Sequence, residues 1–443
     1  MALEGLKTAL GALRDHGLPL ILLRERAFDL ATAQQQGDYD LLAPTGRFDA
    51  TILAFLESLL ATRVSVLVHA AKPEKRLMVL HDEKIETPIV VDLWREHRID
   101  VPGGGQGRTR LLLHDALEPF CKVRGPVLRM PPWLEVAVYV CHLFEKKKDL
   151  KSRGVVERLA FYRGLELVSD QCPPELMEPL RRVAGDLIEA RVDVVSAARL
   201  GCDVLERLGL LGEAPHRGEA RRWWRRRRRR GLARRLGCGP VIAIQGPDGS
   251  GKTTVIEQFT ARPLPGGTGM PLKQVVFKRL YRRSIFRWLY KLVRKLRRLR
   301  DRDEPKELVE VALAPFLFAG AWINYRLMRL FSSRGRTLLM DRFFPDLLLT
   351  NRKAEGEDLD FTRASCFLER LVPRIDCAVL LGANADLLRA RKAEMSDVNT
   401  QLYLRLMCQH YVRRPPENLL VLRTDVPLER SLSILGKTLE SLR

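Results

Sequence analysis

The sequence predicts an α/β protein with more than one domain. Its 443 residues exceed what one ordinary hydrophobic core holds, so two or three domains are expected. Short aliphatic runs alternate with helical patterns in residues 1–101 and again in residues 239–443. A glycine-rich turn at residues 246–251 directly follows one of these runs. This alternation predicts a mostly parallel sheet in residues 239–443, with ligands at the carboxyl ends of its strands.

Composition excludes several classes of protein. Apolar residues make up 46% and charged residues 29%, which is typical of a globular chain and not of a fibrous or disordered one. The eight cysteines form no C-x-x-C pair, so a reducing interior is favoured over a disulfide framework. The N-terminus lacks the pattern of a signal peptide, and no run of about 18 apolar residues follows. We therefore expect a cytoplasmic protein, with attachment to the inner face of a membrane as an alternative.

Residues 1–101 are expected to form a small α/β domain. Strand patterns and helix patterns follow one another in this segment, as a single sheet with covering helices requires. The expected strands are 19–23, one beginning at Tyr39, 64–68 and 88–93, and the expected helices are 3–15 and 48–61.

The middle of the chain has a different character. Helical spacing dominates residues 102–212. Residues 213–238 then contain the run RRWWRRRRRRGLARR, which no core could bury without a partner for every charge. We expect a helical region followed by an exposed arginine-rich linker.

A phosphate-binding loop is predicted at the start of the C-terminal domain. The pattern G-x-x-x-x-G-K-[ST] lies between the strand pattern VIAIQ and the helical pattern TTVIEQF, which is the context that this loop requires. Its glycines let backbone N–H groups face a phosphate, and the helix adds the positive end of its dipole. The predicted nucleotide-binding residues are Gly246, Pro247, Asp248, Gly249, Ser250, Gly251, Lys252, Thr253 and Thr254.

Catalytic roles follow from the chemistry of phosphoryl transfer. Lys252 is expected to neutralise the β and γ phosphates of ATP, and the Thr253 hydroxyl to bind Mg²⁺. Asp341 ends the strand pattern TLLM, where its carboxylate would reach the metal; a capping aspartate is the alternative. Arg389 and Arg391 are expected to close over the transferred phosphate, with an ordinary solvated helix face as the alternative.

These motifs together resemble the thymidylate-kinase-like family of P-loop kinases. The resemblance is carried by GPDGSGKTT, GRTLLMDRF and RARKAE, and it covers residues 239–443. It implies a five-stranded parallel sheet, ATP with Mg²⁺ and an acceptor opposite the loop. Asp248 matches the family's acidic position near the acceptor's sugar, and Asp341 with Arg342 matches its D-R-[YF] motif.

The sequence departs from true thymidylate kinases at the acceptor side. The stretch VVFKRLYRRS lacks the family's Arg-Glu-Pro segment, and Ala321 and Trp322 stand where the family has Asp-Arg. Arg326 lies one helical turn further and is a candidate replacement. DRFFPDLLL and ARKAE are similar to the divergent branch often found beside surface-glycan genes, where the acceptor is usually unassigned.

Three carboxylates in the N-terminal domain form a second candidate site. Asp38 and Asp40 alternate along one strand pattern, and Asp92 ends another that would lie beside it. Such a cluster can hold two divalent ions, although cap and turn aspartates are the alternative. The pattern resembles the nucleotidyltransferase fold of the DNA polymerase β type, over residues 1–100, but lacks the Gly-Ser pair that seats the triphosphate in that family.

The formal charge of +22 predicts contact with an acidic partner. Residues 284–300 alternate an apolar stripe with Lys and Arg, and residues 221–235 are arginine-rich with a Trp pair. Packing against the protein itself, contact with an anionic membrane and binding of nucleic acid are the three interpretations, in that order.

Taken together, the residues predict an ATP- and Mg²⁺-dependent kinase that transfers phosphate to a small nucleotide, sugar or lipid-linked sugar. One alternative is an ATP-binding regulatory or adaptor protein at a membrane surface. The other is a nucleotidyltransferase whose P-loop domain prepares its substrate. The oligomeric state is not determined by the sequence.

Overall fold

The computed structural model describes most of the chain. The described residues are 2–23, 39–72, 74–81, 88–102, 109–146, 150, 152–213, 237–261, 272–277, 280, 306–348, 368–384, 387–388, 390 and 397–440. Asp38, Arg389, Arg391 and the basic segments 221–235 and 284–300 lie outside these residues, so the predictions made for them stay predictions.

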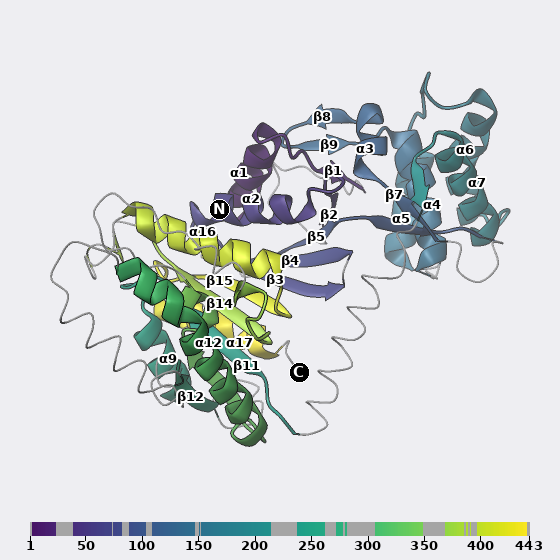
Figure 1. Cartoon of the computed structure of the whole chain (residues 1–443). Helices are drawn as coiled ribbons and strands as arrows, with labels where there is room; N and C mark the ends of the chain where they lie inside the picture. Colours follow the sequence, from purple (N-terminus) through teal and green to yellow (C-terminus); the bar gives the residue numbers. More distant parts are fainter. Residues whose placement is uncertain are drawn as a thin grey trace.

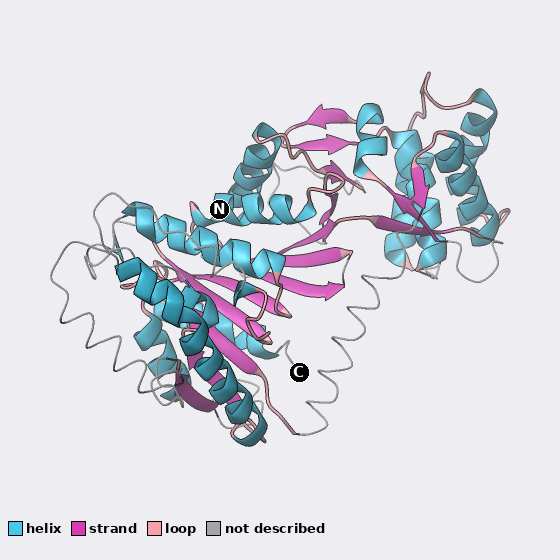
Figure 2. Ribbon diagram, in the orientation of Figure 1, coloured by secondary structure: helices cyan, strands magenta, loops and turns pink. Residues whose placement is uncertain are grey.

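Among the described residues, 12 strands form one sheet. This sheet runs through the molecule (Figures 1 and 2). Its C-terminal part consists of five parallel strands, which confirms the predicted α/β class for this half. In spatial order these are β12 (Leu272–Val276), β13 (Thr337–Asp341), β11 (Val241–Gln245), β14 (Cys377–Gly382) and β15 (Asn418–Arg423). The central strands are buried along their whole length, as their uninterrupted apolar sequences require.

The N-terminal residues continue the same sheet with mixed pairing. The further strands, in spatial order, are β3 (Ser65–Lys72), β4 (Lys75–His81), β5 (Ile89–Trp94), β2 (Tyr39–Leu42), β1 (Ile21–Leu22), β9 (Val127–Arg129) and β8 (Lys122–Arg124). Strand β4 was not predicted, although its side chains alternate between buried and half-buried positions. The strand begins with Lys75 and Arg76 and ends with His81, so its sequence does not stand out as an aliphatic segment.

The two parts of the sheet meet edge to edge at β15 and β3. These strands pair antiparallel, from Asn418 opposite His69 to Val421 opposite Val66. The Arg423 guanidinium donates to the carbonyl of Leu60 at 2.7 Å, which adds a side-chain link to the backbone ladder. This pairing gives both otherwise exposed edges a partner strand.

Helices cover both faces of the sheet, and one hydrophobic core spans both halves of the chain. Apolar residues of α1 (Ala2–Asp15), α2 (Phe48–Leu60), α12 (Lys306–Phe331) and α16 (Asp397–Arg413) share one cluster with the strands, and α13 (Phe344–Leu348) joins it. Helices α9 (Lys252–Ala261) and α17 (Leu428–Glu440) pack in a second cluster with strands of the sheet.

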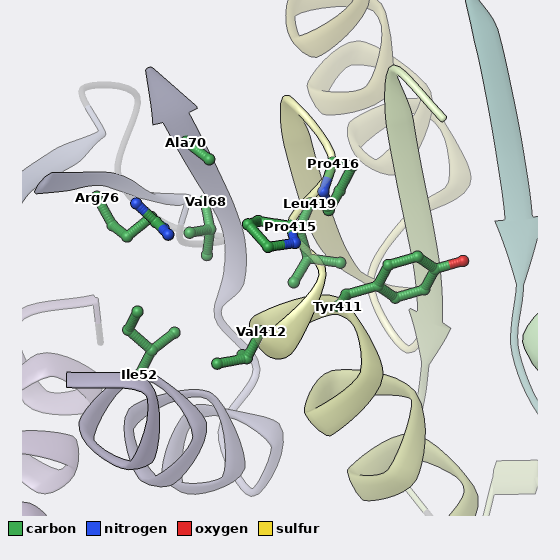
Figure 3. Close-up of a pocket in the computed structure, with 9 residues that line it drawn as sticks. All are labelled: Ile52, Val68, Ala70, Arg76, Tyr411, Val412, Pro415, Pro416 and Leu419. Atoms are coloured by element: carbon green, nitrogen blue, oxygen red, sulfur yellow. The ribbon is translucent and has the colours of Figure 1, made fainter. Parts of the chain in front are cut away.

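A shallow pocket lies where α2 and α16 approach the β3–β15 junction (Figure 3). Ile52 from α2 and Val412 from α16 face each other across it, and Arg76 and Tyr411 line its sides. Helices α2 and α16 are also joined by an ion pair between Arg405 and Glu57 at 2.8 Å. The N-terminal residues are therefore packed directly against a helix of the P-loop half.

Residues 102–212 were expected to be mostly helical, and the structure corrects this in part. Helices α4 (Pro132–Glu145), α5 (Arg153–Arg163), α6 (Pro174–Ile188) and α7 (Val194–Arg207) form a separate cluster, preceded by the short α3 (His114–Leu117) and a 3₁₀ turn at Glu118–Phe120. However, β8 and β9 from this segment belong to the large sheet. A small sheet of β10 (Leu211–Glu213), β7 (Thr109–Leu112) and β6 (His97–Asp100) lies beside the helices. Strands of three or four residues are too short for a periodic pattern to show in the sequence.

Among the described residues, no helix has the length and apolar character needed to cross a membrane.

Candidate functional site

The glycine loop lies between β11 and α9, at the carboxyl end of the central strand. Gly249 and Gly251 both have φ of +82°, a conformation that residues with a Cβ rarely adopt. A Cβ on Gly246 would approach the Leu381 carbonyl oxygen and the Ser250 Oγ to 2.7 Å. The loop therefore requires glycine at these positions, and its tight course lets the backbone approach a phosphate closely.

Lys252 lies at the first position of α9 and folds over the loop. Its Nζ donates to the carbonyl oxygens of Gly246, at 2.7 Å, and Pro247, at 2.6 Å, and lies 3.7 Å from the Asp248 carboxylate. Burial and the nearby Arg342 lower the pKa of Lys252 to about 8, although the carboxylates around it act in the opposite direction. Its ammonium group is therefore held among oxygens in a partly desolvated site.

Asp341 and Arg342 follow at the end of the neighbouring strand β13. Arg342 has φ of +69°, which is strained for a residue with a side chain, and its backbone N–H continues the ladder to the Ile244 carbonyl at 2.9 Å. This turn directs the guanidinium to Asp248 in the glycine loop, at 2.6 Å. The predicted residues Lys252, Asp248 and Arg342 therefore do lie together.

Asp346, in α13, fixes the position of the Arg342 side chain. Its carboxylate accepts hydrogen bonds from Arg342 Nη1 at 3.2 Å, Gln245 Nε2 at 2.8 Å and the Tyr403 hydroxyl at 2.5 Å. Tyr411 in turn donates to the Gln245 side-chain oxygen. A chain of hydrogen bonds thus runs from its buried end at α16 to the partly exposed glycine loop, and α16 is the helix that packs against the N-terminal α2.

Four residues of this hydrogen-bonded chain were not among the predicted site residues: Asp346, Gln245, Tyr403 and Tyr411. Gln245 carried a usable signal, because it is a polar residue at the end of an otherwise aliphatic buried strand. Asp346 lies five positions after Asp341 in DRFFPD, and its role depends on the turn at Arg342. The tyrosines come from a helix more than 50 residues further along, so nothing local to the loop could indicate them.

The residues present are suited to ATP with Mg²⁺. Within the described part of the chain, Ser250 Oγ is buried and makes no hydrogen bond, so a phosphate oxygen could serve as its partner. Thr253 is exposed at the start of α9. Burial raises the pKa of the Asp341 carboxyl, partly offset by Arg342 and Lys252, and bound Mg²⁺ would favour its ionised form.

The acceptor side is less defined. Arg326, suggested as a replacement for the missing family arginine, is exposed on α12 with its guanidinium 4.6 Å from the centre of the Trp322 ring on the same helix. Residues 278–279 and 281–305, next to the stretch that differs from true thymidylate kinases, lie outside the described residues.

The second candidate site brings Asp40 and Asp92 together, as expected. They are direct partners across the parallel strands β2 and β5, and each is 7% exposed. Lys75 on β4 forms an ion pair with Asp92, and the Trp94 indole donates to the Asp40 carboxylate at 3.0 Å. A lysine ammonium therefore already lies beside this carboxylate pair.

A buried parallel strand, a glycine loop and a following helix form the arrangement that is typical of a P-loop fold. Two solved structures are similar to parts of the chain. Thymidylate kinase from Candida albicans shows 14% identity and a TM-score of 0.33, covering 46% of this chain and 92% of its own. Deoxyadenosine kinase from M. mycoides, solved with dCMP and a flexible dCDP bound, shows 11% identity and a TM-score of 0.28, covering 45% of this chain and 99% of its own.

Identities and TM-scores this low carry no inference about the activity of this chain. No family model and no curated protein matches the sequence.

Proposed function

We propose that the protein is an ATP-dependent kinase that transfers the γ phosphate of ATP to a small acceptor. The observation that carries this proposal is the grouping of Lys252, Asp248 and Arg342 around a glycine loop at the carboxyl end of a buried parallel strand. The strained backbone turn that holds the Arg342 guanidinium beside the loop supports the proposal, because such strain is concentrated at functional sites.

Each residue has a role in this proposal. The loop N–H groups and Lys252 hold the phosphates of ATP and balance the charge that develops on the transferred group. Thr253 and Asp341 would hold Mg²⁺, which supplies charge neutralisation between the β and γ phosphates. Arg342, ion-paired with Asp248 at 2.6 Å, would orient the acceptor against the γ phosphate.

The acceptor belongs to the class of small nucleotides, sugars or lipid-linked sugars. This choice depends on the sequence resemblance and on the acidic Asp248 next to a cation, a pairing suited to an acceptor that carries hydroxyl and anionic groups. Cytoplasmic location, peripheral membrane contact through 221–235 and 284–300 and closure by Arg389 and Arg391 belong to the same proposal.

The proposal is tested by ATP consumption with Mg²⁺ against a panel of nucleoside monophosphates, sugars and sugar phosphates. Product should form with one acceptor class and fall by at least about 100-fold in Lys252→Ala. The control is Asp40→Asn at the second site, which should leave this activity unchanged. ATP binding without turnover on any acceptor would instead favour the regulatory or adaptor function.

A second function, nucleotidyl transfer in the N-terminal domain, is favoured by the register that places Asp40 beside Asp92. Divalent-dependent transfer of a nucleotide that is abolished by Asp40→Asn and kept in Lys252→Ala would establish it. Loss of this transfer in Lys252→Ala alone would assign it to the P-loop site.

A further inference from the structure

Two histidines and a glutamate meet where the small sheet contacts the helical region. His97 begins β6, while His142 and Glu145 lie three positions apart in the last turn of α4 and so share one side of that helix. One donor atom from each of the three side chains lies within 4.8 Å of the other two. The cluster is separate from the P-loop and from the Asp40–Asp92 pair.

The cluster is enclosed by protein. His97 is 3% exposed and His142 is 6% exposed, and their rings stack with centroids 6.3 Å apart and planes at 29°. His97 Nδ1, His142 Nδ1 and Glu145 Oε2 are all shielded from solvent. Glu145 reaches towards the surface at its other oxygen, Oε1, which lies 3.7 Å from Lys146 Nζ. Its half-buried carboxylate offers an entry route from solvent.

The donor types select the class of ion. Two imidazole nitrogens and one carboxylate oxygen suit Zn²⁺ and similar first-row transition metals, whereas Mg²⁺ and Ca²⁺ prefer oxygen donors throughout. Zn²⁺ binds such donors at about 2.0–2.2 Å in a tetrahedron, so neighbouring donors would lie roughly 3.4 Å apart. The donor atoms, which lie within 4.8 Å of one another, are therefore close to the spacing of such a site.

We propose that His97, His142 and Glu145 bind one Zn²⁺ ion, with the fourth position open to water or another ligand. The ion links β6 to the end of α4 and so stabilises the contact between the small three-stranded sheet and the helical region. Trp94 connects this cluster to the separate carboxylate pair. The His97 ring packs edge-on against the Trp94 ring, with centroids 5.1 Å apart, and the Trp94 indole donates to the Asp40 carboxylate. The site is independent of the proposed kinase activity.

The test measures zinc bound to the full-length protein after treatment with a chelator, with Mg²⁺ in excess so that oxygen-donor sites are filled. We expect one Zn²⁺ per chain by elemental analysis and a rise in thermal stability on adding it. Competition with a coloured chelator should show affinity lowered by at least about tenfold in Glu145→Gln and further in His97→Gln and His142→Gln. Co²⁺ in place of Zn²⁺ should give the visible spectrum of a tetrahedral site.

The matched control is His114→Gln, a buried histidine of the same region whose Nε2 contacts the Pro19 carbonyl at 2.8 Å. It should bind zinc as the unaltered protein does. If the histidine variants fail to fold, the metal content of the unaltered chain and of Glu145→Gln decides the question. Absence of stoichiometric zinc in the unaltered chain would overturn the proposal. The same conclusion would follow if all three ligand variants bound zinc as tightly as the unaltered chain. Either result would leave a histidine–glutamate cluster that shares protons.

Discussion

The P-loop site and the Asp40–Asp92 site lie in the same sheet, and each combines carboxylates with a lysine. At the P-loop, the Lys252 ammonium donates to two backbone carbonyls of the glycine loop and also lies 3.7 Å from the Asp248 carboxylate. At the second site, the lysine is ion-paired with one of the carboxylates themselves. A lysine beside a carboxylate is therefore common to both sites, and the feature that distinguishes the P-loop site is the glycine loop whose carbonyls bind the Lys252 ammonium.

Removing the Arg342 side chain should have the largest effect on the P-loop site. Arg342→Ala and Arg342→Gly should both lower kcat by about 10²–10³-fold, because each removes the guanidinium that orients the acceptor against the γ phosphate. Glycine should be the more stable variant by about 1 kcal/mol, since φ of +69° suits it better. Steady-state kinetics and urea unfolding of the two variants separate the charge from the backbone strain. Wild-type kcat in Arg342→Ala would show that the site does not use this residue.

Loss of the Asp346 charge should have the next largest effect. Asp346→Asn weakens the hydrogen bonds from Arg342, Gln245 and Tyr403, so unfolding free energy should fall by about 2 kcal/mol. The hydrogen bond from Arg342 contributes only a small share of this loss, because its side chain is 38% exposed and solvent screens the interaction. Tyr403→Phe removes one donor only and should cost about 1 kcal/mol. Denaturant unfolding measures both, and equal stability of Asp346→Asn and the unaltered protein would exclude the supporting role.

Removal of the Lys75 cation tests the second site. Lys75→Met should raise the affinity of the Asp40–Asp92 pair for Mn²⁺ by about tenfold, because a like charge next to a metal position opposes binding. Titration followed by electron paramagnetic resonance, in a Lys252→Ala background, isolates this site. Asp92→Asn added to Lys75→Met should cancel the gain. An unchanged affinity in Lys75→Met would mean that the ammonium does not compete with a metal.

The smallest expected effect is the pH dependence of ATP binding. Burial lowers the pKa of Lys252 to about 8, so its ammonium is present below that pH and is lost as pH rises through it. Phosphates favour the charged form, so binding takes up a proton above pH 8 and affinity falls by up to about tenfold per pH unit. Calorimetry in buffers of different ionisation enthalpy detects that proton. Lys252→Arg stays charged over this range and should show no such slope.

Elements with strong local patterns could be predicted from the amino-acid sequence alone. The glycine loop, the buried strands before and beside it and the helix at Phe48–Leu60 were predicted from residues close together in the chain. The adjacency of Asp40 and Asp92 was also predicted, since alternation along strands limits where such side chains can point.

The contacts between segments that are distant in the chain depend on the tertiary fold and could not be predicted from local patterns. Pairing of β15 with β3 joins residues about 350 positions apart, and no local pattern specifies which strand edges will pair. The same holds for Tyr403 and Asp346, for Lys75 and Asp92 and for His97 with His142. Each pair depends on the folded path of the chain between its members, because hydrogen bonds and ion pairs across elements form only after packing has placed those elements side by side.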